Sequence, residues 1–119
     1  EISGLEEPLP EENIKGIVLS SIEGTTSTYE SSNELTNQLH KNIQRSLLGN
    51  HVSIPTDCPQ RDERMGWTGD AQVFSRTATY YGDMNLLYEG WEGTIRDAQT
   101  ASGTIPQTAP NLGWEQVWR

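Results

Sequence analysis

The segment from Asp57 to Asp70, DCPQRDERMGWTGD, holds the densest group of reactive side chains in the sequence. It combines carboxylates, guanidinium groups and an indole: Asp57, Asp62, Glu63, Asp70, Arg61, Arg64 and Trp67. Prolines near its start and glycines within it argue against a regular helix or strand. We therefore predict a shaped loop, and loops that a scaffold holds in place often carry function.

Carboxylates grouped around an indole can support three kinds of chemistry. They can coordinate Ca²⁺ or Mg²⁺, act as general acid and base, or accept hydrogen bonds from the hydroxyls of a sugar that lies on the indole face. The calcium interpretation is disfavoured, because the alternating acids, central glycine and terminal glutamate of an EF-hand loop are missing. The structural alternative is a solvated loop whose acids and arginines form compensating ion pairs.

The adjacent acids Asp62 and Glu63 are flanked by Arg61 and Arg64. A second carboxylate or burial by an indole raises the pKa of a carboxyl group, whereas a neighbouring arginine lowers it. Such opposed environments allow one carboxyl group to donate a proton while its neighbour stays ionised. The pair is therefore a candidate for acid–base chemistry.

Three helices are predicted around this loop. The first begins after the capping residues 31–33 and ends at Gly49-Asn50, with an apolar residue at every fourth position: Leu35, Leu39, Ile43 and Leu47. The second runs from about Gly69 to Tyr81, with Asp70 near its start and apolar-face positions Val73, Phe74, Thr77, Ala78 and Tyr81. The third spans about Met84–Thr100, with Leu87, Trp91, Ile95 and Ala98 on one side. Short connections predict antiparallel helix pairs.

The first thirty residues have a different character. An acidic, proline-containing loop over residues 1–13 precedes two predicted strands, Ile14–Leu19 and Gly24–Glu30. We therefore expect residues 1–30 to be the end of a β-domain with its linker, and residues 31–119 to be helical. The fold class is predicted to be mainly α.

Composition limits the classes of partner. The net charge of −9 disfavours nucleic acids and anionic membranes, both of which attract basic surfaces. No apolar run approaches the roughly 18 residues of a transmembrane helix. Because Cys58 is the single cysteine, an internal disulfide is ruled out, and we interpret Cys58 as a small packing residue. We also interpret His40 as a structural residue. The 33% hydrophobic content is low for a self-contained domain, so we expect a piece of a larger protein.

The motif DCPQRDERMGWTGDAQ closely resembles the signature of the bacterial α-L-rhamnosidases of glycoside hydrolase family 78. The resemblance extends from about Tyr29 to Trp118, through NELTNQLHKNIQRSLLGNHVSIPTDCPQR and ATYYGDMNLLYEGWEGTIRDAQTASGTIPQTAP. It implies the first helices of an (α/α)6 catalytic barrel, preceded by strands from a β-sandwich domain. The implied partners are rhamnose-containing glycosides or polysaccharides and the rest of the same barrel, with no metal or other cofactor.

By the same resemblance, Glu63 is the general acid of an inverting hydrolysis of terminal α-L-rhamnose. The implied substrate-binding residues are Asp57, Arg61, Asp62, Trp67, Asp70 and Trp114. The match at Trp114 departs from the family's usual Gly-Trp-Gly-Asp run, because Glu115 and Gln116 follow it here. An inverting enzyme needs a second carboxylate as general base, and we expect that residue beyond Arg119.

Two other functions are compatible with the same residues. A non-catalytic carbohydrate-binding module could use the loop to hold a sugar, and it should then bind rhamnose as this chain alone. Another α/α-barrel glycosidase could act on a different sugar, which a panel of aryl glycosides would reveal. A barrel fragment should instead be poorly stable alone, because three amphipathic helices leave apolar faces uncovered.

Overall fold

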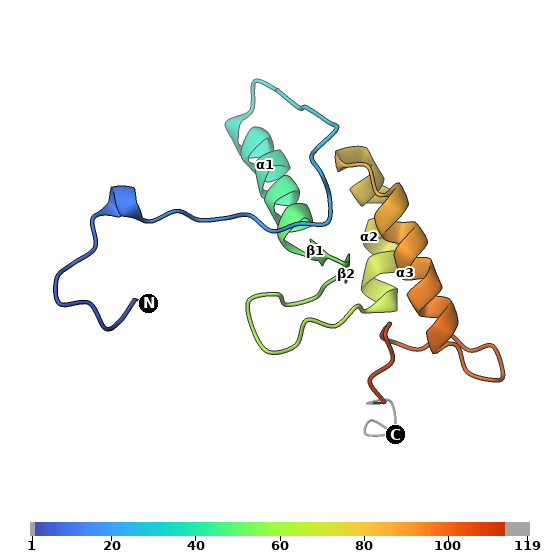
Figure 1. The fold of residues 1–119 in the computed structure, drawn as a ribbon. Helices are drawn as coiled ribbons and strands as arrows, with labels where there is room; N and C mark the ends of the chain where they lie inside the picture. Colours follow the sequence, from blue (N-terminus) through green and yellow to red (C-terminus); the bar gives the residue numbers. More distant parts are fainter. Residues whose placement is uncertain (1, 114–119) are drawn as a thin grey trace.

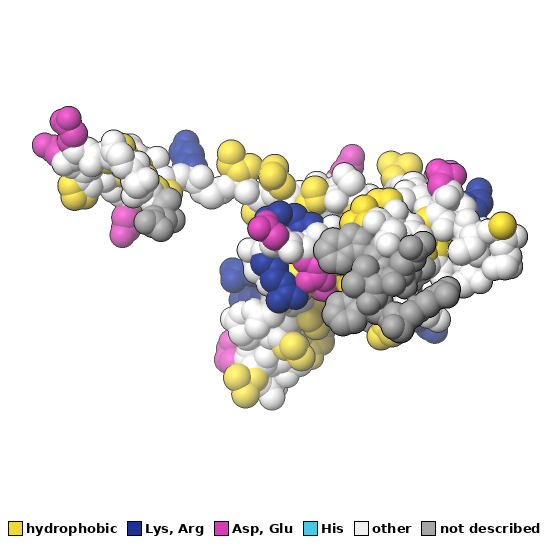
Figure 2. All heavy atoms as spheres, turned by 90° about the horizontal axis from the view of Figure 1, so that it is seen from below, with side chains coloured by type: hydrophobic (Ala, Val, Ile, Leu, Met, Phe, Trp, Pro, Cys, Tyr) yellow, Lys and Arg dark blue, Asp and Glu magenta, His cyan; other side chains and the backbone are white. Residues whose placement is uncertain are grey.

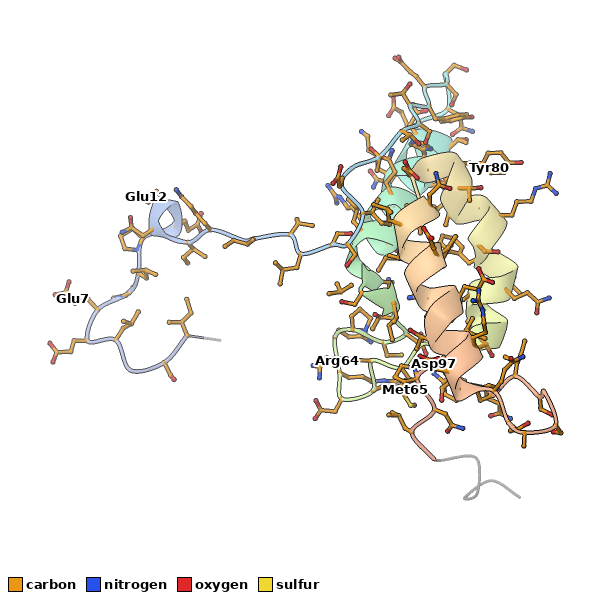
Figure 3. All side chains as sticks on the ribbon, turned by 45° about the vertical axis from the view of Figure 1, so that its right-hand side comes forward. Glu7, Glu12, Arg64, Met65, Tyr80 and Asp97 are labelled. Carbon is orange, nitrogen blue, oxygen red and sulfur yellow. The ribbon has the colours of Figure 1, made fainter. Side chains whose placement is uncertain are left out.

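The structure is a computed structural model that describes residues 2–113; Trp114 lies outside the described residues. A short 3₁₀ helix, η1 (Glu11–Asn13), is followed by α1 (Glu34–Gly49), β1 (His51–Val52) and β2 (Ile54–Pro55). Two further helices follow, α2 (Thr68–Tyr81) and α3 (Asn85–Ala98). The prediction of a mainly α-helical chain with three helices is confirmed, with boundaries shifted by a few residues. Helices α2 and α3 lie side by side, joined by a short turn (Figures 1 and 3).

Helix α1 begins at the predicted cap. The side chain of Asn33 accepts a hydrogen bond of 3.0 Å from the backbone N–H of Leu35, which satisfies one of the free donors of the first turn. Only the last part of the predicted apolar stripe is covered. Leu47 is fully buried, whereas Leu35 and Leu39 are 81% and 56% exposed, because no described element packs over the start of this helix.

Two small clusters form the core. The first contains Ile22, Leu47, Ala78, Met84 and Leu87, and joins α1 to α2 and α3. The second contains Ala71, Trp91 and Ala109, and joins α2 and α3 to the segment after α3. Tyr88 packs against both clusters. The predicted inward face of α3 is confirmed at Leu87 and Trp91, but Val73 of α2, predicted on an apolar face, is 84% exposed.

The two strands predicted before residue 31 are wrong for the described chain. Thr25 makes only an isolated bridge with Gly82, and the hydrophobic residues Ile17, Val18 and Leu19 are 83%, 76% and 71% exposed. A strand needs the N–H and C=O groups of a neighbour, and no described segment lies beside residues 14–19. Figure 2 shows hydrophobic side chains exposed along the segment that extends away from the helices.

The described helices include none that is both long enough and apolar enough to cross a bilayer. Helix α1, the longest at 16 residues, carries polar and charged side chains along much of its length.

Candidate active site

The site loop, residues 57–67, is fixed at both ends. At its start, the N–H of Asp57 donates to the carbonyl oxygen of Met65 at 2.9 Å and closes the loop on itself. At its end, Trp67 forms an isolated antiparallel bridge with Thr108, and the N–H of Ala109 donates to the carbonyl oxygen of Gly66 at 2.9 Å. The loop therefore rests on the segment that follows α3.

Two residues of the loop adopt left-handed backbone conformations. Cys58 has φ of 47° and Arg64 has φ of 58°, a region that side chains other than glycine visit uncommonly. These two turns lie on either side of Glu63 and bend the chain so that the Glu63 side chain faces Trp67 and Cys58. The conformation explains how residues so close in sequence converge on one point.

Both oxygens of the Glu63 carboxylate accept hydrogen bonds. Oε1 accepts from the indole Nε1 of Trp67 at 2.9 Å. Oε2 accepts from Nη2 of Arg61 at 2.7 Å and from its Nε at 3.2 Å. The Glu63 side chain is 17% exposed, so the group lies in a partly enclosed position rather than in open solvent.

These contacts determine the charge of the group. The hydrogen bond from Arg61, followed by that from Trp67, lowers the pKa of Glu63 to about 2. Both donors stabilise the ionised form, as expected for a carboxylate that accepts charged and neutral N–H groups. In this arrangement Glu63 is therefore a carboxylate, although a general acid must carry a proton.

Asp57 and Cys58 complete the group around Glu63. One side-chain ligand atom from each of the three residues lies within 4.8 Å of the others. Burial raises the pKa of the Cys58 thiol, and hydrogen bonds with Glu63 and Asp57 raise it further. The thiol is thus a neutral donor between two carboxylates. Because both Glu63 oxygens already accept hydrogen bonds, we keep the prediction that the site needs no metal.

A cavity of about 280 Å³ opens beside this group. Its lining includes three of the predicted site residues, Asp57, Trp67 and Asp70, together with His51, Phe74 and Tyr88. Trp67 therefore connects the cavity to Glu63, since this residue lines the cavity and its Nε1 donates a hydrogen bond to the carboxylate. The volume lies just below the roughly 300–1,000 Å³ of pockets that hold drug-sized ligands.

The other predicted residues have different positions. Asp62 faces outward: its side chain is fully exposed, and its Oδ1 accepts from Nη1 of Arg64 at 3.3 Å. Figure 3 shows Arg64 at the outer edge of the loop. Asp70 is exposed in the first turn of α2, where the N-cap position belongs to Trp67. The structure thus brings together Asp57, Arg61, Glu63 and Trp67, and their roles toward a sugar stay predictions.

His51 is a cavity residue that the sequence did not single out. Its ring is buried, and Nδ1 lies 2.8 Å from the carbonyl oxygen of Leu47. Since a carbonyl only accepts, Nδ1 carries the hydrogen and Nε2 is left as an acceptor in the neutral ring. Burial lowers the pKa of His51, and the bond to Leu47 opposes that shift. The sequence shows only a histidine just after a predicted helix end, and that pattern does not predict that the ring is buried beside a cavity.

The fold and the site define a helical-hairpin scaffold with a carboxylate-bearing loop at one end. The family described as the bacterial alpha-L-rhamnosidase 6 hairpin glycosidase domain matches residues 24–118. The chain belongs to this family.

Individual relatives agree with that assignment. The chain is 44% identical to an alpha-L-rhamnosidase of Formosa agariphila, with 98% of this chain and 14% of the relative covered. It is 40% identical to an alpha-L-rhamnosidase of Streptomyces avermitilis, with 85% of this chain and 10% of the relative covered. The chain thus spans a seventh or less of the length of these curated relatives.

Solved structures give the same fold. An alpha-L-rhamnosidase from Aspergillus terreus superposes with a TM-score of 0.80 at 44% identity, over 89% of this chain and 12% of that one. The Streptomyces avermitilis alpha-L-rhamnosidase complexed with L-rhamnose gives a TM-score of 0.76 at 41% identity, over 81% of this chain and 9% of that one. The chain is therefore mainly α and forms part of a six-hairpin α/α-barrel glycosidase fold.

Proposed function

We propose that the protein containing this chain hydrolyses terminal α-L-rhamnosides with inversion, and that Glu63 is its general acid. The observation that carries the proposal is the placement of Glu63. Its carboxylate is partly enclosed and is joined through Trp67 to a cavity that Asp57 and Asp70 also line. Glu63 itself is not among the residues that line the cavity, but carboxylates beside an indole in one cavity suit a sugar ring, whose hydroxyls donate and whose C–H face packs on the aromatic ring.

In the proposed reaction, the protonated Glu63 donates its hydrogen to the glycosidic oxygen as the bond to the anomeric carbon breaks. A second carboxylate removes a proton from water as that water attacks the opposite face of the sugar. The two carboxyl groups of an inverting enzyme are about 6.5–9.5 Å apart. Asp57 is closer than that to Glu63, so we assign Asp57 to sugar hydroxyls and the general base to another part of the protein.

The remaining assignments follow from the same proposal. We place Arg61, Asp62, Trp67 and Asp70 among the residues that contact rhamnose, and Trp114 as an aromatic residue from the segment after α3. The substrates are rhamnose-containing glycosides or polysaccharides. No step of this proton-transfer mechanism requires a metal or organic cofactor.

The surroundings of the chain are also proposed. Leu35 of α1, Val73 of α2 and Leu86 of α3 are 81%, 84% and 84% exposed, and further helices of the same barrel would cover them. Residues before 31 would lead from a β-sandwich domain, whose strands would pair with the exposed run around Ile17 and Val18. Both proposals account for apolar surface that would otherwise face water.

The test is hydrolysis of an aryl α-L-rhamnoside by the complete enzyme, followed by proton NMR of the sugar released in the first minutes. The proposal predicts that β-L-rhamnose forms first and then equilibrates with the α anomer. First formation of the α anomer would show retention and would exclude the assigned mechanism. Lack of hydrolysis of rhamnosides, with turnover of another glycoside, would exclude the proposed substrate.

A further inference from the structure

We propose that Arg61 is a movable positioning residue that holds Glu63 as a carboxylate until sugar hydroxyls compete for the guanidinium group. When Arg61 leaves, Oε2 of Glu63 can take up the proton that Glu63 later donates to the glycosidic oxygen. This inference rests on the proposed function, and it adds an order of events and a specific oxygen to the role of Glu63.

The two donors on Glu63 differ in how firmly they are held. Trp67 is partly buried, and its backbone is fixed by the bridge to Thr108 and by the adjacent bond from Thr68 N–H to the carbonyl oxygen of Gln107 at 2.8 Å. Arg61 has a long side chain that is 64% exposed. The guanidinium end of this ion pair is therefore open to solvent, where other acceptors can reach Arg61 and replace Glu63. The indole is therefore the fixed partner and the guanidinium the mobile one.

This difference decides which oxygen can be protonated. Neither donor can accept a proton, because an indole N–H only donates and a guanidinium stays charged at any working pH. While Arg61 remains on Oε2, its positive charge opposes protonation there, and Trp67 continues to occupy Oε1. When Arg61 moves, Oε2 loses this charged partner and takes up a proton from the buffered solvent. Trp67 then keeps the carboxyl group oriented through Oε1.

Sugar hydroxyls are suitable competitors for Arg61. The guanidinium presents five N–H donors in a planar fork, and neighbouring hydroxyl oxygens of a pyranose can accept two of them at once. Departure of the guanidinium then raises the proton affinity of Glu63, because the hydrogen bond from Arg61 is the largest contribution that favours the ionised form. Binding of the sugar is thereby coupled to uptake of the proton.

The test measures proton uptake when L-rhamnose binds to the complete enzyme. Calorimetric titrations at about pH 5 in two buffers of different ionisation enthalpy give the number of protons taken up. We expect a measurable uptake of at most about one proton per sugar bound. Glu63→Gln removes the titrating group and should abolish the uptake. Arg61→Gln should reduce it by more than half, because binding no longer has an ion pair to break.

Arg64→Gln is the matched control. Arg64 lies in the same loop and carries the same charge, but its carboxylate partner is the exposed Asp62, so proton uptake should match that of the unaltered enzyme. A second measurement serves if Arg61→Gln binds rhamnose too weakly for calorimetry. The alkaline limb of kcat/KM against pH should move upward by about one pH unit or more in Arg61→Gln, because the arginine no longer lowers the pKa of Glu63.

The outcomes separate this inference from the proposed function. Rhamnose binding without proton uptake, or uptake that persists in Glu63→Gln, would overturn the role of Arg61 while hydrolysis itself remained intact. An unshifted alkaline limb in Arg61→Gln would do the same. If the unaltered enzyme neither bound nor hydrolysed rhamnosides, the proposed function would fail, and this inference with it.

Discussion

Gly66 lies where the site loop meets the segment after α3, and a methyl group there would collide with backbone. A Cβ at Gly66 would stand 2.5 Å from the carbonyl oxygen of Ala109, 3.1 Å from Cδ1 of Ile54 and 3.3 Å from Nε1 of Trp91. The closest of these atoms belongs to the main chain and cannot rotate away as a flexible side chain could. Gly66→Ala must therefore push the loop and the segment around Ala109 apart.

The cost follows from two contributions. Overpacking of a well-packed site costs about 1–3 kcal/mol. The bond from Ala109 N–H to the carbonyl oxygen of Gly66, 2.9 Å long, would be lost or lengthened at a cost of roughly 1 kcal/mol. We expect Gly66→Ala to lower the free energy of unfolding by about 2–4 kcal/mol. Trp67 follows directly, so its bond to Glu63 should weaken and kcat should fall as well.

The assay is thermal unfolding of the complete enzyme followed by tryptophan fluorescence, with aryl rhamnoside hydrolysis measured on the same samples. Gly90→Ala is the matched control: Gly90 lies exposed in α3, and a Cβ there meets nothing within 4 Å. Alanine in a helix interior is more favourable than glycine by up to about 1 kcal/mol, so this variant should be as stable or more stable. If Gly66→Ala were as stable and active as Gly90→Ala, the packing described for the loop would be incorrect.

Three further predictions follow from the core, the buried histidine and the absence of any metal-dependent step. Leu47→Ala, at a fully buried position, should lower stability by about 2–5 kcal/mol; a change in unfolding midpoint no larger than that of a surface variant would contradict the described core. Burial lowers the pKa of His51, so the unfolded chain binds more protons below the ordinary histidine pKa. Stability should therefore fall as pH drops below about 6.5, and His51→Phe should reduce that slope in unfolding midpoints measured between about pH 5 and 8. Incubation with a chelator should leave rhamnoside hydrolysis unchanged, and a loss restored by added metal would refute the proton-transfer mechanism.

The helices could be predicted because their signals are local. Asn33 caps α1, and the spacing of Leu87 and Trp91 marks the buried side of α3, as the structure confirms. Leu35 and Val73 follow the same periodicity yet lie exposed, because burial depends on a neighbouring element and periodicity shows only which face could be buried. The strands expected before residue 31 fail for the same reason, since strand pairing is not a local property.

The site was predictable in composition but not in geometry. The motif placed Asp57, Arg61, Glu63 and Trp67 in one loop, and the pairing of Arg61 with Glu63 follows from opposite charges close in sequence. The hydrogen bond from the Trp67 indole to Oε1 of Glu63 depends on left-handed backbone conformations at Cys58 and Arg64. Neither cysteine nor arginine favours that conformation, so the sequence could not predict it. The outward position of Asp62 and the place of His51 in the cavity also depend on that path of the chain.

The central claim is that Glu63 protonates the departing oxygen, and its most direct test compares two leaving groups in the Glu63→Gln variant of the complete enzyme. With a phenyl or alkyl rhamnoside, which needs protonation to depart, kcat should fall by about 10²–10⁴-fold. With a dinitrophenyl rhamnoside, which departs as a stable anion, the loss should be far smaller, and rhamnose should still bind. Equal losses with both substrates, or near-normal turnover of the phenyl rhamnoside, would contradict the account.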